Sequence, residues 1–372
     1  MLRTLRNLTV NLIAAFIRDR EARHRFRNKY KIRSKFRKLR DDNRRLFSEN
    51  QTMRNDITNL KGELSRLRES YNSFLWEWER EKCMVFNVVP LDDSPPQGPD
   101  TNVFLAIACV AKNEGPYLRE WIEYHKIVGV ERFYFYDNES DDNTKEILEP
   151  YIKDGTVVYH YLKNHPITKQ RPQIEALNDA IFKYRDRTRW MAIIDADEFI
   201  VPVETNSIPE FLADYEQYPA VAVNWVCFDS NGHEKKPEAH DGLLTVNYTR
   251  VMKNHNKGSD RVIKTIVNPK QVINYISTHF GLYYQSTHAV TENFQTVRGM
   301  VTRFHSSSKI RINHYITKSR EEYIKKIQRN QKGNTNVYKF REDLLNFPEE
   351  TTEDLIIHKY LPRLNQALGI KK

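Results

Sequence analysis

Residues 191–199 have the sequence Met-Ala-Ile-Ile-Asp-Ala-Asp-Glu-Phe, an apolar run that ends in two aspartates one residue apart. A short apolar run of this kind predicts a buried strand, with Asp195 and Asp197 at its C-terminal edge. Hard divalent cations take oxygen ligands and commonly share them with a phosphorylated substrate. The stretch therefore predicts a site for a nucleotide diphosphate and a metal ion.

The segments around this stretch alternate between strand and helix patterns. Strands are predicted at residues 103–110, 132–136, 156–162 and 190–194, and helices at 116–129, 144–152 and 173–184. Such βαβ repetition specifies an α/β fold, a Rossmann-like and mostly parallel sheet covered by helices. Ligands of these sheets bind beyond the carboxyl ends of the strands.

Polar clusters stand at those carboxyl ends. They are Lys112-Asn-Glu114 after the first strand, residues 137–142 after the second, Lys169-Gln170-Arg171 before the third helix, and residues 195–198 after the fourth strand. Each cluster alone is a weak signal, because the same residue types form ordinary turns and helix caps. Their repeated placement predicts one joint site at a single edge of the sheet.

The basic excess of the chain is local. The first 82 residues hold 22 Lys and Arg against 11 Asp and Glu, which leaves 37 basic and 38 acidic residues in the remainder. A neutral body with a basic appendage argues against a nucleic-acid-binding enzyme and favours an anionic membrane surface as partner, with a basic arm on RNA as the alternative. No stretch approaches the roughly 20 apolar residues of a spanning helix. We therefore expect a cytoplasmic protein, peripheral at the inner face of the cytoplasmic membrane.

The N-terminal part separates into three segments. Residues 1–31 predict a basic amphipathic helix that associates with membrane, or alternatively one that packs on its own globular domain. Residues 32–82 carry an unbroken heptad pattern, in which Asn43 and Asn50 at a positions favour a parallel homodimeric coiled coil over a helix folded back on the main domain. Residues 83–102 contain a Pro-rich linker.

The C-terminal part is predicted to be helical again. Ser319-Arg-Glu-Glu322 is a capping box that opens one helix. An apolar stripe over residues 353–368 predicts a C-terminal helix within residues 346–372, broken at Pro362.

Five motifs in order resemble glycosyltransferase family 92 and the related bacterial family-2-like transferases. They are Ala111–Trp121, Tyr136–Asp142, Ile194–Phe199, Phe228–His233 and Asn313–Ser319. The resemblance covers roughly residues 103–330 and leaves out the helical N-terminus. It implies a GT-A catalytic domain over residues 103–345, preceded by the long helical coiled coil.

The resemblance also implies an activity. A metal-dependent transferase would move a sugar from a nucleotide-diphosphate sugar, by inverting displacement, to a glycan or lipid-linked acceptor in cell-surface polysaccharide synthesis. Glu114 and Asp137 would contact the nucleoside, and Asp195 the ribose or a metal-bound water. Asp195, Asp197 and His314 are the implied ligands of Mn²⁺ or Mg²⁺. Lys112, Lys169, Gln170 and Arg171 are expected donor contacts, and Glu198 is either a metal ligand or a partner of Lys112.

Inversion also requires a base beside the acceptor hydroxyl. The polar loop after the predicted strand at residues 221–228 offers Asp229, Glu234 and Asp241. Glu234 is slightly favoured, because related families tend to have a small residue where this chain has Asp229.

Two other functions remain open from the sequence. A nucleotidyltransferase would use a similar sheet and carboxylates, but it usually has a Gly-rich phosphate loop that residues 111–116 do not supply. A non-catalytic coiled-coil scaffold with a degenerate transferase domain would not require intact carboxylates at Asp195 and Asp197.

Overall fold

The computed structural model of the chain describes residues 32–85, 94–163, 172–238, 242–252, 261–284, 287–332 and 351–370. The chain divides into two compact units, Met1–Glu81 and Lys82–Lys372. The predicted helix over residues 1–31 lies outside the described residues. None of the described helices combines the length and the apolar character that crossing a bilayer requires.

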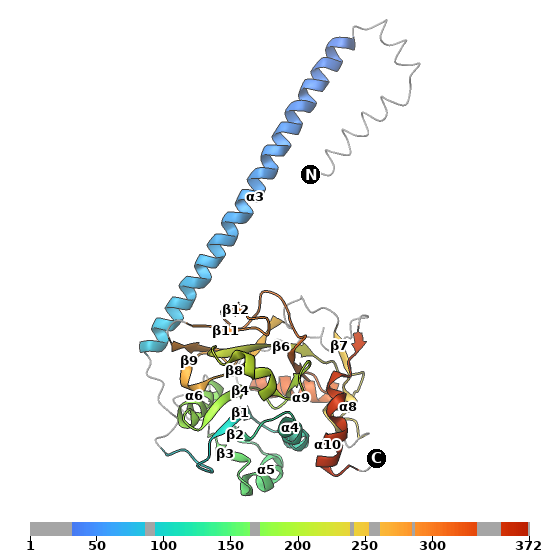
Figure 1. Ribbon diagram of the computed structural model, residues 1–372. Coiled ribbons are helices and arrows are strands. Elements are labelled where there is room, and N and C mark those ends of the chain that lie inside the picture. Colours follow the sequence, from blue (N-terminus) through green and yellow to red (C-terminus); the bar gives the residue numbers. More distant parts are fainter. Residues whose placement is uncertain are drawn as a thin grey trace. The chain divides into compact units, whose positions relative to one another are not determined.

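The long helix α3 (Ile32–Val85) spans 54 residues and covers the predicted heptad region (Figure 1). Its apolar side chains at a and d positions are exposed to between 45% and 68%; these are Leu46, Met53, Ile57, Leu60, Leu64 and Leu67. The helix is confirmed over this region, whereas its pairing into a coiled coil stays a prediction.

The first half of the second unit follows the predicted order of strands and helices. The elements are β1 (Val103–Ala111), α4 (Gly115–Ile127), β2 (Arg132–Asp137), α5 (Thr144–Lys153), β3 (Val157–Tyr161), α6 (Pro172–Tyr184) and β4 (Thr188–Ile193). Each boundary lies within two residues of the predicted one.

The second half adds mostly short elements. They are β5 (Glu198–Pro202), α7 (Ile208–Leu212), β6 (Ala220–Cys227), α8 (Leu244–Asn247), β7 (Arg250–Met252), β8 (Ile263–Val267), β9 (Val272–Tyr275), β10 (Gly281–Tyr283), β11 (Ala289–Val290), β12 (Thr296–Val297), β13 (Ile310–His314), α9 (Arg320–Lys332), β14 (Thr351–Glu353) and α10 (Leu361–Leu368).

The central sheet is mixed, with a parallel part and an antiparallel part. Its strand order is β12-β11-β6-β8-β4-β1-β2-β3. Strands β4, β1, β2 and β3 run parallel to one another, while β8 is antiparallel to both β4 and β6. Strand β13 pairs in parallel with β6 and antiparallel with β5. The mostly parallel α/β prediction is confirmed, and the antiparallel insertion of β8 is an addition to it.

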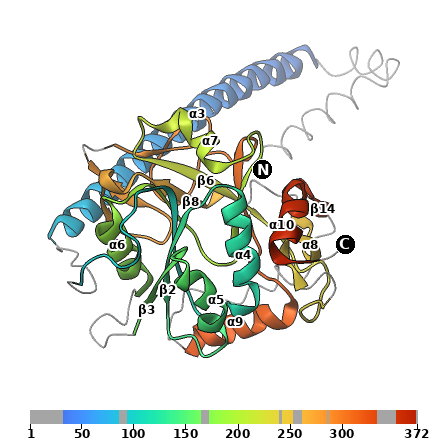
Figure 2. The ribbon, with the colours of Figure 1, turned by 60° about the horizontal axis from the view of Figure 1, so that its bottom comes forward.

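Helices cover both faces of the parallel part of the sheet (Figure 2). Successive side chains of a strand point to opposite faces, so β1 contributes to two apolar clusters. Leu105 and Ile107 pack in the cluster that contains residues of α4 and α5, and Ala106 and Ala108 pack in the one that contains residues of α6. Burial on both faces explains why β1 is apolar along its whole length.

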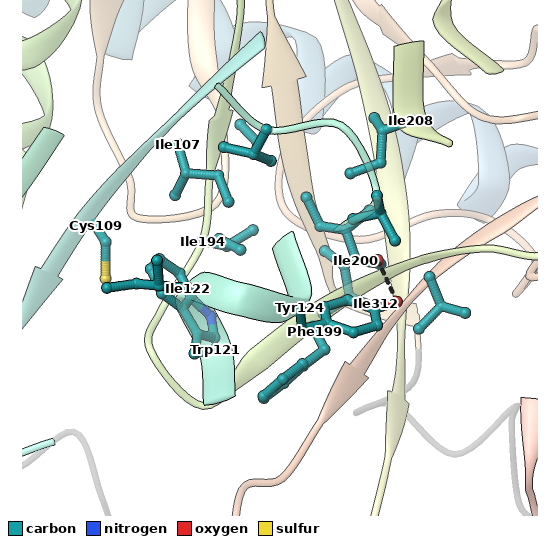
Figure 3. Packing of buried hydrophobic residues seen from close by; sticks show 14 of the residues in the cluster. Ile107, Cys109, Trp121, Ile122, Tyr124, Ile194, Phe199, Ile200, Ile208 and Ile312 are labelled. Atoms are coloured by element: carbon teal, nitrogen blue, oxygen red, sulfur yellow. Dashed lines mark hydrogen bonds between the residues drawn. The ribbon is translucent and has the colours of Figure 1, made fainter. Parts of the chain in front are cut away.

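Helix α4 fixes the backbone of β5, which follows the Asp195-Ala-Asp197 stretch directly. The indole Nε1 of Trp121 donates to the carbonyl of Glu198 at 2.8 Å. The hydroxyl of Tyr124 donates to the carbonyl of Ile200 at 3.0 Å (Figure 3). These buried hydrogen bonds hold the turn between β4 and β5 in a defined position.

The C-terminal segment differs from the predicted helix over residues 346–372. Residues 351–353 form β14, which pairs with β7, and Ile356–Tyr360 form a 3-10 helix before α10. Pro362 lies in the first turn of α10 and does not break the helix. The N–H groups of the first turn have no acceptor within the helix, so the N–H that proline lacks is not needed there.

Candidate active site

The turn that follows β4 carries the two aspartates of the opening motif. Glu198 closes this turn, because its Oε2 accepts from the N–H of Asp195 at 2.8 Å. Its own N–H donates to the carbonyl of Asp195 at 3.1 Å. Burial raises the pKa of Glu198 well above its ordinary value, against the opposing charge of Lys264.

Asp195 is bonded to a buried lysine from the antiparallel strand β8. The Nζ of Lys264 donates to Oδ2 of Asp195 at 2.8 Å and to the carbonyl of Thr278 at 3.2 Å. It also lies 3.7 Å from Oε2 of Glu198. Burial lowers the pKa of Lys264, but the charges of Asp195 and Glu198 raise it by more, so the lysine stays protonated.

Asp197 is buried and bonded to a lysine from helix α9. The Nζ of Lys326 donates to Oδ2 of Asp197 at 2.6 Å, and Nε2 of His314 lies 3.7 Å from Oδ1. Burial raises the pKa of Asp197, whereas the charges of Lys326 and Lys318 lower it by more, so the net shift is downward. Asp197 is therefore an anion at neutral pH.

His314 lies at the end of β13, in the motif that the sequence singled out. Its ring packs against Trp225, with centroids 4.3 Å apart. Burial lowers the pKa of His314 to about 4, although the charge of Asp197 opposes the shift. Within the described part of the chain its Nδ1 is buried without a hydrogen-bond partner. The imidazole is thus neutral at physiological pH.

The predicted capping box at the start of α9 is confirmed. The N–H of Ser319 donates to Oε2 of Glu322 at 3.1 Å, and the N–H of Glu322 donates back to the hydroxyl of Ser319 at 3.4 Å. The other oxygen of Glu322 accepts from the hydroxyl of Tyr117 at 2.6 Å. Helix α9 is therefore tied to α4, and Lys326 one turn further on reaches Asp197.

A third lysine, Lys318, lies beside Glu114 at the start of α4. Lys318 is bonded to the carboxylate of Glu114 and lies over the ring of Tyr117, with Nζ 4.5 Å from the centroid. Lys236, from the polar loop after β6, lies 4.3 Å from the same centroid. Lys318 also adopts a φ of 50°, a conformation that non-glycine residues rarely take. The polar loop, the end of β1 and the segment between β13 and α9 thus meet around Tyr117.

Asp137 holds the turn after β2. Its Oδ1 accepts from the N–H of Ser140 at 2.9 Å, and its Oδ2 accepts from the hydroxyl of Tyr159 at 2.7 Å. Asn113, with a φ of 60°, exchanges hydrogen bonds with Asp141 across the ends of β1 and β2. These contacts order the edge where the family resemblance implies the nucleoside.

The three candidate bases differ in their surroundings. Asp229 is buried, and its Oδ1 accepts from the N–H of Asn231 at 2.6 Å and from Nε of Arg250 at 3.3 Å. The side chain of Glu234 is 74% exposed and lies 3.4 Å from Arg320. Asp241 lies outside the described residues, as do the predicted donor contacts Lys169, Gln170 and Arg171.

The predicted metal ligands are not brought together as one set. Asp195 is bonded to Lys264 and Asp197 to Lys326. Across the described ranges, no three His, Cys, Asp or Glu side chains are arranged to hold a metal ion. In this geometry these residues do not fit a divalent cation, because each aspartate already binds an ammonium group: Oδ2 of Asp195 accepts from Lys264, and Oδ2 of Asp197 accepts from Lys326.

Three lysines of the site were missed by the sequence interpretation. Lys318 stands inside the Asn313–Ser319 motif, and Lys326 lies four residues after the capping-box Glu322, where helical spacing places both on one face. The motif position of Lys318 and the helical spacing of Lys326 are therefore signals that the sequence offers. Lys264 offers none, because its approach to Asp195 depends on the antiparallel insertion of β8.

Comparisons with known proteins agree with the motif resemblance. Residues 106–355 match the model of glycosyltransferase family 92. A family 92 protein of Oryza sativa subsp. japonica is 28% identical over 181 residues, which is 48% of this chain and 30% of the rice protein. Galactan beta-1,4-galactosyltransferase GALS2 of Arabidopsis thaliana is 29% identical over 126 residues, covering 31% of this chain and 24% of the relative.

Solved structures overlap more loosely. S. aureus TarS 1–349 is 14% identical with a TM-score of 0.29, covering 45% of this chain and 48% of TarS. Glucosyl-3-phosphoglycerate synthase from Mycobacterium tuberculosis is 19% identical with a TM-score of 0.24, covering 33% of this chain and 44% of the synthase. The chain spans less than a third of the length of the curated relatives named above. Since the family match takes in well over half of its residues, the chain belongs to glycosyltransferase family 92.

Proposed function

We propose that this chain transfers a sugar from a nucleotide-diphosphate sugar to a hydroxyl acceptor, with residues 103–345 as its GT-A catalytic domain. The proposal rests on one observation: Asp195, Asp197 and Glu114 lie at the carboxyl ends of β1 and β4, and each is bonded to a lysine. These lysines are Lys264, Lys326 and Lys318. Ligands of α/β sheets bind at this edge. Family membership selects sugar transfer among the reactions that such an edge could support.

In this reaction the site must stabilise the negative charge that develops on the leaving diphosphate. When the bond from the anomeric carbon to the diphosphate breaks, its electron pair goes to the diphosphate oxygen. Preorganised positive groups at that position lower the barrier to bond cleavage. In an inverting displacement the acceptor oxygen attacks from the opposite face, and a base takes its proton.

Glu234 is our proposed base, because its side chain is exposed to an acceptor, whereas Asp229 is buried and its Oδ1 accepts from Asn231 and Arg250. The backbone carbonyl of Glu234 accepts from the N–H of Glu321 at 3.0 Å, which keeps the polar loop beside α9. Loss of a general base lowers turnover by about 100-fold or more. We expect Glu234→Gln to lower kcat to this extent with little change in donor KM.

Glu238 provides the matched control, since it is an exposed glutamate of the same loop. Glu238→Gln should retain the activity of the wild type. Equal activity of Glu234→Gln and Glu238→Gln would remove Glu234 as the base and leave Asp241 as the candidate.

A donor screen tests the proposed activity. The purified full-length chain is incubated with UDP-, GDP-, ADP- and dTDP-sugars, and the released nucleoside diphosphate is measured by mass spectrometry. Activated galactose is included because the Arabidopsis relative is a galactan beta-1,4-galactosyltransferase. We expect release from one nucleotide class by the wild type and not by Asp197→Asn. Release of pyrophosphate would indicate a nucleotidyltransferase, and no release from any donor would favour a non-catalytic scaffold.

Metal dependence is tested in the same screen. The sequence predicts Mn²⁺ or Mg²⁺, whereas the described side chains do not assemble a ligand set. Parallel reactions with a chelator and with added Mn²⁺ separate the two expectations. If activity requires Mn²⁺, the enzyme binds a cation, and the described side chains must rearrange to hold it.

The acceptor that we propose is a glycan or a lipid-linked glycan used in polysaccharide synthesis at the inner face of the cytoplasmic membrane. The basis is the excess of arginine in residues 1–31, which favours an anionic lipid surface. The full-length chain should float with anionic liposomes, and reversal of Arg23, Arg25 and Arg27 to Glu should abolish flotation. Equal flotation of both proteins would contradict membrane attachment.

A second copy of this chain is the proposed partner of α3. The exposed a and d side chains, with Asn43 and Asn50 at a positions, favour a parallel dimer over other partners. Sedimentation should give a dimer for the wild type and a monomer for the double variant Leu60→Glu with Leu64→Glu. Asn59→Glu, at a c position of the same turn and outside the predicted interface, is the control. A monomeric wild type would refute the dimer.

A further inference from the structure

An ammonium group stands where the sequence predicts a divalent cation. Lys326 reaches Asp197 from α9, and its side chain is 28% exposed whereas that of Asp197 is 6% exposed. The lysine therefore has a route outward that the aspartate does not have. Lysine carries a compact charge on a flexible stem, so its head group can exchange one oxygen partner for another.

A second ammonium group is held in the same way. Lys318 is bonded to Glu114, with side chains that are 10% and 13% exposed. Lys318, Lys326 and His314 all lie on one continuous segment, which runs from the end of β13 through the first turns of α9. Two carboxylates from the ends of two parallel strands thus present two lysines to the same edge of the sheet.

The two possible occupants of this edge have opposite charges. A divalent cation placed on Asp197 would face the Lys326 ammonium at a few ångströms, and like charges at that distance repel. A diphosphate brings negative oxygens that accept charge-assisted hydrogen bonds from both lysines. Once they leave their carboxylates, the two ammonium groups are therefore complementary to an anion.

We propose that Lys318 and Lys326 form the diphosphate clamp of the donor site, and that Glu114 and Asp197 hold the two ammonium groups in place until the donor binds. This inference rests on the proposed function. In the transfer step the anomeric carbon–oxygen bond breaks, its electron pair stays on the diphosphate oxygen, and both ammonium groups stabilise that charge. The new bond forms to the acceptor oxygen, whose proton goes to the base.

Calorimetric titration of the full-length chain tests the clamp. The probes are UDP, GDP and inorganic pyrophosphate, each with a chelator and with Mn²⁺. We expect the wild type to bind a nucleoside diphosphate in the chelator, and Lys326→Met and Lys318→Met each to weaken that binding by about tenfold or more, because a charge-assisted hydrogen bond is lost. Lys326→Arg, which keeps the charge, should recover part of the affinity.

Lys325→Met is the matched control. Lys325 lies next to Lys326 on α9 and pairs with Glu321 at 2.7 Å on the exposed side of the helix. This variant should bind the probes as the wild type does. Thermal unfolding of every variant identifies a folding defect, and if Lys326→Met does not fold, Lys318→Met and Lys326→Arg decide the outcome.

Three outcomes would overturn the clamp. If Lys326→Met binds like the wild type, the lysine assignment fails while the proposed function stands. If Lys326→Met gains Mn²⁺-dependent affinity, Lys326 obstructs a cation and does not bind the diphosphate. If the wild type binds no probe under either condition, the clamp and the proposed function fail together.

Discussion

Two buried carboxylates of the α/β unit, Glu292 and Asp197, are satisfied by different kinds of donor. Glu292 accepts from the backbone N–H groups of Ser308, Lys309 and Ile310 at 2.9, 2.8 and 2.9 Å. The hydroxyl of Ser308 adds a further bond at 2.9 Å. These donors belong to the segment that enters β13, so Glu292 fixes the course of the chain there.

Asp197 is satisfied by a side chain instead. Its described hydrogen-bond donor is the ammonium of Lys326, and the neutral His314 lies 3.7 Å away. A lysine head group can leave a carboxylate without any change in backbone conformation. Backbone donors at Glu292 can leave only if the segment unfolds locally.

The difference separates a structural site from a reactive one. A carboxylate surrounded by backbone N–H groups contributes to the free energy of unfolding, because every lost bond leaves a buried group unsatisfied. A carboxylate held by a lysine that can exchange partners is suited to accept a charged substrate. We therefore expect substitutions at the two sites to affect different measurements.

The largest effect is expected on turnover in Asp197→Asn. Loss of the charge that positions Lys326 should lower kcat by about 100-fold to 1,000-fold, the range for removal of one preorganised electrostatic group. The unfolding free energy should change by about 1 kcal/mol, because Lys326 is partly exposed and can move into water. Steady-state kinetics and denaturant unfolding measure the two quantities. Unchanged turnover would place the reaction elsewhere.

The next effect is expected on stability in Glu292→Gln. The amide can accept on one side only, and its NH₂ group would face the N–H donors of the β13 segment. We expect a loss of about 3 kcal/mol of unfolding free energy, in the range for hydrogen bonds to a buried charged group. Denaturant unfolding checks the loss, and kcat and KM of the folded variant should equal those of the wild type. A selective loss of kcat would show that Glu292 also acts in the reaction.

The stability difference at Glu292 should depend on pH. Burial raises the pKa of Glu292, but the hydrogen bonds from Ser306 and the backbone lower it by more, so the net value falls below its ordinary 4.5. A depressed carboxyl pKa stabilises the folded state above the unfolded value, and this stabilisation is lost as pH falls through the folded value. The gap in Tm between the wild type and Glu292→Gln should therefore be full at pH 7 and narrow below about pH 4. A gap that widens with acid would contradict this sign.

The smallest effect is expected in Tyr117→Phe. Its hydroxyl donates to Glu322, a carboxylate that also accepts from the backbone N–H of Ser319 and so combines both kinds of donor. Loss of one such bond should cost about 1 kcal/mol of unfolding free energy. Kinetics should show a modest rise in donor KM, because α9 is less firmly placed. An unaffected KM would show that α9 does not need this tether.

The sequence was sufficient for the parallel half of the fold and for the position of Asp195 and Asp197 after β4. Apolar runs and helix periodicity located β1 to β4 because local pattern determines these elements, and Asp195 and Asp197 follow from the end of a strand. Partners that depend on long-range topology were not accessible. Lys264 is 69 residues from Asp195 and has no local signal. Lys326 is 129 residues from Asp197, and helical spacing from Glu322 indicates only the helix face on which it lies, not its partner.

The C-terminal helix shows a second limit. A proline within an apolar stripe predicts a break, whereas Pro362 lies in the first turn of α10, where proline is common. Residues 351–353, which precede α10, form β14 and pair with β7. Strand pairing at a distance in sequence overrides a local helical pattern.

The most direct test of the account is a crystal structure of the full-length chain with the nucleoside diphosphate that the donor screen selects. We predict that its phosphate oxygens lie within hydrogen-bond distance of Lys318 and Lys326, at the carboxyl ends of β1 and β4. A diphosphate bound at another surface, with the pair between Asp197 and Lys326 undisturbed, would contradict the assignment of this edge as the donor site.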